Sequence, residues 1–268
     1  MKRLILHTIF AFAFPLTMLS QLAEIGVQGG MSNFVGDVGN SFVPSGYNVG
    51  LIYRYQFDER YALRFHGMYG EISGYDNQAT SDFKKNRNLD FQSSIWEGAA
   101  LVEFNFFEYV TGSKKKWHTP YIFAGLGFFK FNPTSTYDGQ IYELQPLGTE
   151  GQGSSLSNTA AYGLWGLNIP FGLGYRISAG DHFSFALEMG FRNTSTDYLD
   201  DVSGRYVDPN RLARENGEAA AFFADRSLTA TDKTLTMRGD ADRNDWYVFT
   251  GVTVFVALTP KGERCKRF

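Results

Sequence analysis

The chain has 268 residues, of which 16% are aromatic, 29 are glycine and one is cysteine, and its formal net charge is −3. So small a net charge excludes the strongly basic proteins that bind nucleic acid, and a single cysteine excludes an internal disulfide framework. The mean hydropathy is slightly polar despite the many aromatic residues. Strands that alternate apolar and polar residues produce this mixture, because the two faces average to near neutrality.

Residues 1–20 predict a secretory signal peptide. Two basic residues precede an apolar stretch from Leu4 to Leu19, and the small residue Ser20 precedes a plausible cleavage point. A retained transmembrane helix is the structural alternative. The remaining sequence has no continuous apolar run of ~18 residues, so residues 21–268 are expected to form one domain that ends in a short basic tail at 259–268.

Eight segments alternate apolar and polar residues with the period of two that is typical of strands. They are Ile25–Val35, Tyr47–Phe57, Tyr61–Tyr69, Trp96–Phe106, Tyr121–Phe131, Leu167–Ile177, Phe183–Phe191 and Trp246–Leu258. The fifth segment is apolar on both faces and is interrupted by two glycines. Each segment approaches the ~9–11 residues that a tilted strand needs to cross a bilayer.

The lengths of the connections favour a barrel over a secreted β-sandwich, which is the alternative. Three connections are short and three are long, and the first is intermediate. The short ones are Asp58–Glu59, Glu108–His118 and Ser178–Asp181, the long ones are Ser73–Asp90, Asn132–Trp165 and Asn193–Asp245, and the intermediate one is Asp37–Ser45. Such segregation is typical of outer-membrane barrels, in which the short turns face the periplasm. The aromatic residues that flank the short turns fit a membrane interface there.

The sequence therefore predicts an all-β fold: an eight-stranded antiparallel up-and-down transmembrane β-barrel in the bacterial outer membrane. Short periplasmic turns, long extracellular loops and two periplasmic termini complete the prediction. The barrel would be surrounded by the lipid bilayer. Because every backbone amide in hydrocarbon must be hydrogen-bonded within the protein, the sheet must close.

If the apolar faces point at lipid, the charged faces fall inside the barrel. Four arginines and three glutamates then form a lumen ion-pair network, with His66 beside them: Arg54, Arg64, Glu97, Glu103, Arg176, Glu188 and Arg192. Eight strands enclose an interior just wide enough for side chains, and buried charges persist when they are paired. We expect a filled lumen without an open pore; ion conduction or gating is the alternative.

No motif for catalysis or for a cofactor is present. The sequence has no P-loop, no HExxH motif and no zinc spacing of Cys and His, and none of its four histidines falls in a long loop. We therefore expect no enzyme activity and no cofactor. Four aspartates in the last loop could hold calcium through oxygen ligands, although their spacing is not that of an EF-hand. They are Asp197, Asp200, Asp201 and Asp208; a solvated or arginine-paired loop is the alternative.

Two basic segments lie on the expected periplasmic side. One is the turn with Lys114, Lys115 and Lys116, and the other is the tail with Lys261, Arg264, Lys266 and Arg267. They could dock an acidic periplasmic partner, or they could serve only solubility and orientation. Cys265 in the same tail could form an intermolecular disulfide in an oxidising compartment, or remain a spectator thiol.

Several strings in the strands and loops carry a resemblance to a known family. They are FVGDVG at 34–39, TPYIFAGLGFFKFNP at 119–133, YDGQIYELQPLGTEGQG at 137–153, NTSTDYLDDVSGRYVD at 193–208, ADRS at 224–227 and RGDADRNDWYVFTGV at 238–252. Together they resemble the PorG-like outer-membrane β-barrel family of Bacteroidota, over nearly the whole mature chain. The string NRLARENGEAAAFF at 210–223 is less characteristic of it.

The resemblance implies a component, or a paralogue of a component, of the type IX protein secretion system and of the gliding motility that depends on it. In that family the barrel is held to anchor a periplasmic secretion ring, made of a lipoprotein and its partner, to the outer membrane. The resulting hypothesis is a non-enzymatic anchor or assembly component. The alternative is a surface barrel that uses its long loops for adhesion or ligand binding.

Overall fold

The computed structural model describes residues 22–39, 43–229 and 231–258. The signal-peptide prediction for residues 1–20 and the basic tail at 259–268 lie outside the described residues. The described strands are β1 (Leu22–Val35), β2 (Pro44–Gln56), β3 (Tyr61–Tyr75), β4 (Asp90–Asn105), β5 (His118–Tyr137), β6 (Gln140–Glu143), β7 (Trp165–Ala179), β8 (Phe183–Thr194) and β9 (Trp246–Ala257). The helices are η1 (Asp76–Gln78), α2 (Asp82–Arg87), η2 (Gln145–Leu147), α3 (Pro209–Asn216) and α4 (Glu218–Ala224). No helix among the described residues is long and apolar enough to cross a membrane.

The sheet closes on itself. Each long strand pairs antiparallel with the next along the chain, β5 passing directly to β7, and β9 returns to pair with β1. Every long strand thus has two partners, and the barrel has no free edge. The predicted eight-stranded antiparallel barrel is confirmed. The short strand β6 is an addition, and it forms a hairpin with the end of β5, where Thr134 pairs with Glu143.

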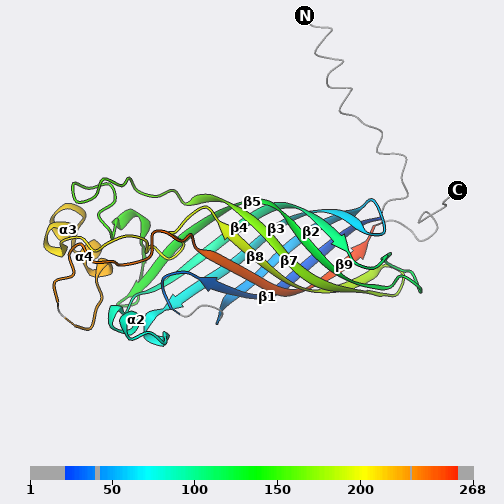
Figure 1. Cartoon of the computed structure of the whole chain (residues 1–268), viewed down its shortest axis with the longest axis horizontal. Coiled ribbons are helices and arrows are strands. Elements are labelled where there is room, and N and C mark those ends of the chain that lie inside the picture. The colour runs from blue at the N-terminus through cyan, green and yellow to red at the C-terminus, as the bar shows by residue number, and fades with distance from the viewer. Residues whose placement is uncertain (1–21, 40–42, 230, 259–268) are drawn as a thin grey trace, which may run out of the picture.

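The two ends of the barrel differ, and Figure 1 shows the difference along its long axis. The long connections gather at one end, here called the long-loop end, together with α2, α3 and α4. The opposite, short-turn end carries the β2–β3, β4–β5 and β7–β8 connections. Both ends of the described chain are there too, since the Leu258 N–H donates to the Ala23 carbonyl at 2.8 Å.

The strands run further toward the long-loop end than the alternation predicted. β3 continues to Tyr75, β4 begins at Asp90 and β5 reaches Tyr137. On these extensions the inward face stays apolar, as at Ile72 and Phe91, which are buried. The outward face becomes polar there, as at Gln92 and Ser94, so the alternation is the reverse of that in the apolar band although the strand continues.

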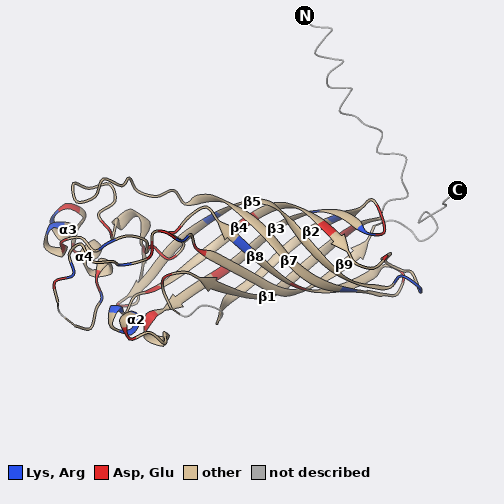
Figure 2. Ribbon diagram, viewed as in Figure 1, with Lys and Arg blue, Asp and Glu red and all other residues tan. Residues whose placement is uncertain are grey.

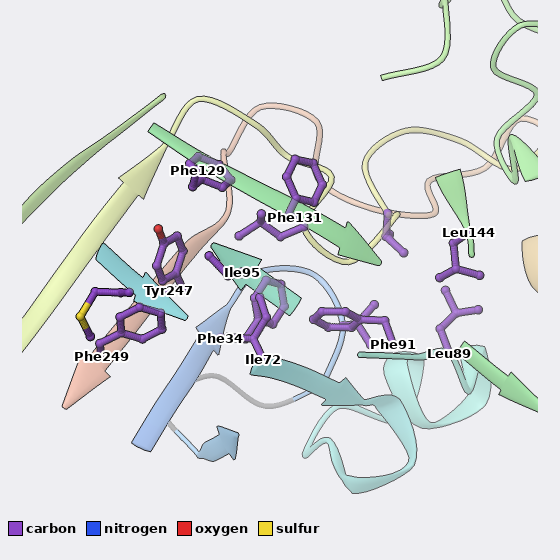
Figure 3. Packing of buried hydrophobic residues seen from close by; sticks show 14 of the residues in the cluster. Phe34, Ile72, Leu89, Phe91, Ile95, Phe129, Phe131, Leu144, Tyr247 and Phe249 are labelled. Carbon is purple, nitrogen blue, oxygen red and sulfur yellow. The ribbon is translucent and has the colours of Figure 1, made fainter. Parts of the chain in front are cut away.

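A large apolar core fills the half of the barrel next to the long loops (Figure 3). Its buried members come from five of the barrel strands and from the loops: Phe34, Met68, Ile72, Phe91, Ile95, Phe129, Phe131, Tyr247 and Phe249 from strands, and Val38, Leu89, Leu144, Leu199, Val202 and Phe223 from loops and helices. This core continues from the barrel interior into the loops without a break. The three long connections, 76–89, 138–164 and 195–245, therefore pack as a lid on the barrel. We call the described residues of these connections the cap.

Candidate functional site

The lumen near the short-turn end holds a fully buried ion-pair network. Glu103 accepts from two arginines: Arg54 Nε lies 2.8 Å from its Oε1, and Arg176 Nη1 lies 2.5 Å from the same oxygen. Arg64 Nη1 pairs with Glu188 Oε1 at 2.8 Å. Alternation sends these side chains inward because their neighbours in sequence are the apolar residues of the outer wall.

Glu24 completes this network and was missing from the sequence prediction. Its Oε2 lies 2.9 Å from Arg54 Nη1, and its Oε1 accepts from the Thr111 hydroxyl. The lumen therefore contains four glutamates opposite four arginines, rather than three. The sequence does indicate this inward position, because Glu24 directly precedes Ile25, which lies on the outward face of the first strand.

A second polar layer surrounds Glu97 in the middle of the barrel. His66 Nε2 lies 2.7 Å from Glu97 Oε1, Arg192 Nε lies 3.2 Å from Oε2, and the Tyr247 hydroxyl donates to Oε2. Asn168 Nδ2 also donates to Oε2, at 2.9 Å. The structure thus brings together all seven lumen residues singled out in the sequence, in one paired layer near the short turns and one near the middle.

Together with the apolar core, these two layers occupy the lumen from end to end. The arginine heads also stack on rings: Arg176 Cζ lies 4.6 Å from the Tyr121 ring centre, and Arg192 Cζ lies 4.6 Å from that of Phe249. A charged guanidinium over an aromatic face gains further stabilisation in a dry interior. Over the described residues, an interior filled in this way is a packed core, as expected inside eight strands.

The cap is held by its own buried ion pairs. Arg87 Nε pairs with Asp76 Oδ2 at 2.7 Å, and Arg238 Nη1 pairs with Glu150 Oε1 at 2.9 Å. Both arginines also donate to loop carbonyls, and Arg87 Nη1 reaches the carbonyl of Arg238 at 2.5 Å. Since these pairs join the β3–β4, β5–β7 and β8–β9 connections, the three long loops form one folded unit.

The four aspartates proposed for calcium are not brought together around one point. Asp208 caps α3 by accepting from the Asn210 N–H at 2.8 Å, and Asp201 accepts from the Thr149 and Tyr162 hydroxyls, both at 2.6 Å. Asp200 accepts from the backbone N–H groups of Val38 and Val202. Across the described ranges, no group of three or more His, Cys, Asp or Glu side chains is arranged to hold a metal ion. Burial raises the pKa of Asp201 to about 6, although Arg238 opposes this rise.

The remaining aspartate, Asp197, lies with others that the sequence reading had not singled out. Asp37, Asp240, Asp242 and Asp245 line the same pocket of about 520 Å³ at the long-loop end. Burial raises the pKa of Asp197 to about 7 and raises that of Asp245 well above its ordinary value, with the neighbouring aspartates adding to both. The pocket is therefore an electrostatically costly part of the cap at neutral pH.

At the short-turn end, the β4–β5 turn carries the predicted lysines. Lys114 and Lys115 are exposed at its tip, whereas Lys116 Nζ is paired with Glu59 Oε2 at 2.5 Å and Glu108 Oε2 at 2.9 Å. These two glutamates raise the pKa of Lys116. Beside the tip is a hollow of about 370 Å³, lined by Gly112, Ser113, Lys114, Trp117, Ser178, Gly180 and Asp181. Lys261, Arg264, Cys265, Lys266 and Arg267 lie outside the described residues.

The outer wall of the barrel is apolar, with aromatic belts at two levels. In Figure 2 the charged residues are frequent in the loops and sparse along the strands. The belt near the short turns contains Phe57, Tyr61, Phe104, Phe106, Phe107, Trp117, His118 and Tyr175, many in ring contact. The belt toward the long loops contains Tyr47, Tyr69, Trp96, Trp165, Phe171, Phe191 and Trp246. Between the belts most of the outward side chains are aliphatic or aromatic, as at Leu51 and Leu173, which are 64% and 58% exposed.

Comparison with known proteins gives one family and a general likeness of fold. A family model described as "Domain of unknown function (DUF6089)" matches residues 2–231. No curated protein matches the chain. Three similar solved structures are Ail, the attachment invasion locus protein of Yersinia pestis (12% identity, covering 90% of this chain and 99% of that chain, TM-score 0.40), Neisserial surface protein A (9%, 87% and 96%, TM-score 0.42) and the outer membrane protein OprG from Pseudomonas aeruginosa (10%, 88% and 98%, TM-score 0.41). Similarities this low carry no argument about function.

Proposed function

The chain belongs to the family of the domain of unknown function DUF6089, and from its sealed barrel we propose that it is a non-enzymatic outer-membrane anchor that holds a periplasmic assembly. The observation that carries the proposal is the filled lumen. A barrel with no route for solutes has only its wall and its two ends to act with. We assign the wall to the membrane and the short-turn end to the partner.

The assignment to the membrane rests on the outer wall. Burying apolar surface is worth about 25 cal/mol per Å², and this wall exposes large side chains such as Leu51, Leu126, Leu167 and Leu187, each at least 60% exposed. A water-soluble protein of this size rarely exposes so continuous an apolar surface. Aromatic belts at two levels suit the two interfaces of a bilayer, and in bacterial barrels the short turns face the periplasm.

The assignment of the partner rests on the resemblance to PorG-like barrels together with the β4–β5 turn. The turn presents two unpaired lysines, Lys114 and Lys115, beside the 46% exposed ring of Trp117 and the adjoining hollow. Aromatic anchors beside a pocket with a charged rim are typical of protein interfaces. The partner suggested by the resemblance is the periplasmic ring lipoprotein of a type IX secretion system, which the sequence predicts could also be docked by the basic tail with Lys261, Arg264, Cys265, Lys266 and Arg267.

Cross-linking pull-down from native membranes tests this proposal. The intact protein should capture a periplasmic ring lipoprotein, and a deletion strain should lose secretion of type IX cargo. Lys114→Glu with Lys115→Glu should reduce capture at least tenfold, whereas Lys85→Glu, an exposed lysine of the cap, should leave it unchanged. Equal capture by both variants, or normal secretion by the deletion strain, would refute the anchor role.

A second candidate is a surface barrel that binds a ligand or a host surface through the cap. It is favoured by exposed apolar side chains on the cap, where Ile141, Leu228 and Leu235 are at least 70% exposed. Removing the β6 hairpin, residues 138–143, would then abolish binding to the target surface while cargo secretion continues. The anchor proposal predicts a different result for the charge reversal of Lys114 and Lys115. That change should impair cargo secretion and leave binding to a target surface intact.

A further inference from the structure

One cation stands on the apolar outer wall. Among the described residues, Lys130 on β5 is the one Lys or Arg at an outward strand position between the two aromatic belts or level with them. It lies level with the belt toward the long loops, because its register partners are Trp96 on β4 and Trp165 on β7. The two tryptophans are 61% and 65% exposed.

Lys130 has no acidic partner. Its recorded contact is with the Trp165 ring, whose centre lies 5.7 Å from Nζ, and no ion pair involves it within the described ranges. Two acids of the outward face lie nearby, and each has other partners. Glu71 accepts from the Tyr47 and Tyr69 hydroxyls at 3.1 and 2.9 Å and from Gln92 at 3.3 Å, and Glu143 accepts from Asn132 Nδ2 at 3.0 Å. A cation at the membrane boundary without a protein counter-ion is free to bind an anion there.

An apolar groove begins directly below this cation. One outward position further down the ladder, Phe128 on β5 pairs with Gly98 on β4, and Gly98 pairs with Gly67 on β3. One position below that, Leu126 pairs with Ala100. The Phe128 ring lies over Gly98, since a Cβ built there would meet its Cζ at 2.9 Å, whereas Gly67 is uncovered.

The groove is a real hollow in the wall. Its volume is about 470 Å³, and its lining includes Phe65, Gly98, Ala100, Leu126, Phe128 and Leu167. A Cβ built on Gly67 would meet no atom within 4 Å, so the space above this glycine is open. Elsewhere on the outward face of the same strands bulky side chains stand out, as at Trp96 and Val102.

We infer that this site binds lipid A, the phosphorylated and acylated lipid of the outer leaflet: Lys130 takes a phosphate and the groove beneath it takes an acyl chain. Lys130 and the two indoles lie at one level with the groove beneath them, which matches the phosphate at the membrane interface and the acyl chain below it in such a lipid. The inference rests on the proposed membrane orientation, because the belt toward the long loops is then the one in the outer leaflet.

Native mass spectrometry of the mature full-length protein in detergent tests the inference, with lipid A, phosphatidylglycerol and phosphatidylcholine titrated in parallel. Lipid A should bind with the highest affinity. Lys130→Gln should weaken its binding about tenfold, as expected for loss of one charge-assisted contact. Gly67→Leu adds a side chain beside the groove, at an outward position where a Cβ would meet no atom within 4 Å, and it should weaken lipid A binding while Lys130 is intact.

Lys85→Gln is the matched control, and it should leave lipid A binding unchanged. A heat-dependent gel shift identifies folded barrels, so that each variant is compared in its folded form. Unchanged lipid A binding in both Lys130→Gln and Gly67→Leu would overturn the site, and equal affinity for phosphatidylglycerol would overturn its assignment to lipid A. Failure of the anchor proposal is read separately, since partner capture depends on the opposite end of the barrel.

Discussion

Arg176 and Glu103 form a bidentate ion pair across the inside of the barrel, with Nη1 2.5 Å from Oε1 and Nη2 3.1 Å from Oε2. Both side chains are fully buried. Arg54 shares the same carboxylate and also reaches Glu24. Buried charges of this kind stabilise a fold only as a complete set, because each one left without a partner retains its desolvation cost.

We therefore predict that Glu103→Gln destabilises the barrel by about 3–5 kcal/mol, the range for removing one member of a buried pair. Two arginines would lose their shared counter-ion at once. Urea unfolding in detergent or lipid, followed by tryptophan fluorescence, measures the free energy of unfolding. Glu215→Gln, whose partner Arg211 is exposed, should leave the unfolding midpoint unchanged. An equal midpoint for Glu103→Gln and the intact protein would contradict a role for the network in stability.

A second prediction concerns conduction. Since paired charges and the apolar core fill the lumen, the protein should show no steady large-conductance channel in a planar bilayer. An open porin in the same lipid serves as the control for insertion and for the recording. Steady channels recorded from single inserted barrels would be incompatible with a filled interior.

A third prediction tests whether the cap is part of the barrel core. Phe131 is fully buried and stacks on Tyr162 of the β5–β7 loop, with ring centres 6.2 Å apart. Phe131→Ala should cost about 3–5 kcal/mol through the cavity it leaves, and it should speed hydrogen exchange in the cap. The matched control is Phe128→Ala, three positions away on the outward face, which leaves no cavity in this core. If the two variants exchange alike, the cap folds independently of the lumen.

A fourth prediction follows from the acidic pocket of the cap. The pKa of Asp197 is raised from an ordinary value of 3.8 to about 7 by burial and neighbouring acids. Between these two values the folded state holds a proton that the unfolded state has released, so stability is highest below about pH 4 and falls as the pH rises toward 7. Asp245 and Asp37 are shifted in the same direction.

Limited proteolysis of the cap across this pH range measures the effect. Cleavage in the loops of the intact protein should increase from pH 5 to pH 8, and Asp197→Asn should flatten that increase. Asp232→Asn, at an exposed position whose pKa is lowered by its hydrogen bonds to Thr234, is the control and should leave the profile unchanged. A pH-independent cleavage rate in the intact protein would refute the prediction.

The barrel itself could be predicted from the sequence because a strand between lipid and lumen must alternate with period two. That rule predicts that Arg54, Arg64, Glu97 and Arg176 lie inside, and all four are buried in the structure. It failed in part at the long-loop end, where β3, β4 and β5 leave the apolar band and their outward faces turn polar. Glu24 was overlooked because it lies at the start of the first strand, next to the predicted signal peptide.

What the sequence alone determined is therefore the strands, their two faces and the two kinds of connection, since these follow from local periodicity, while closure followed from the need to bond every backbone amide in hydrocarbon. Only the tertiary structure decided which charges pair, how the loops fold into a cap, and that Asp197 lies with Asp37 and Asp245 rather than with Asp208. The physical reason is that these contacts join residues up to 208 positions apart, as Asp37 and Asp245 are on the walls of one pocket. The same is true of Lys130 and the groove below it, which exist only where β3, β4 and β5 lie side by side in register.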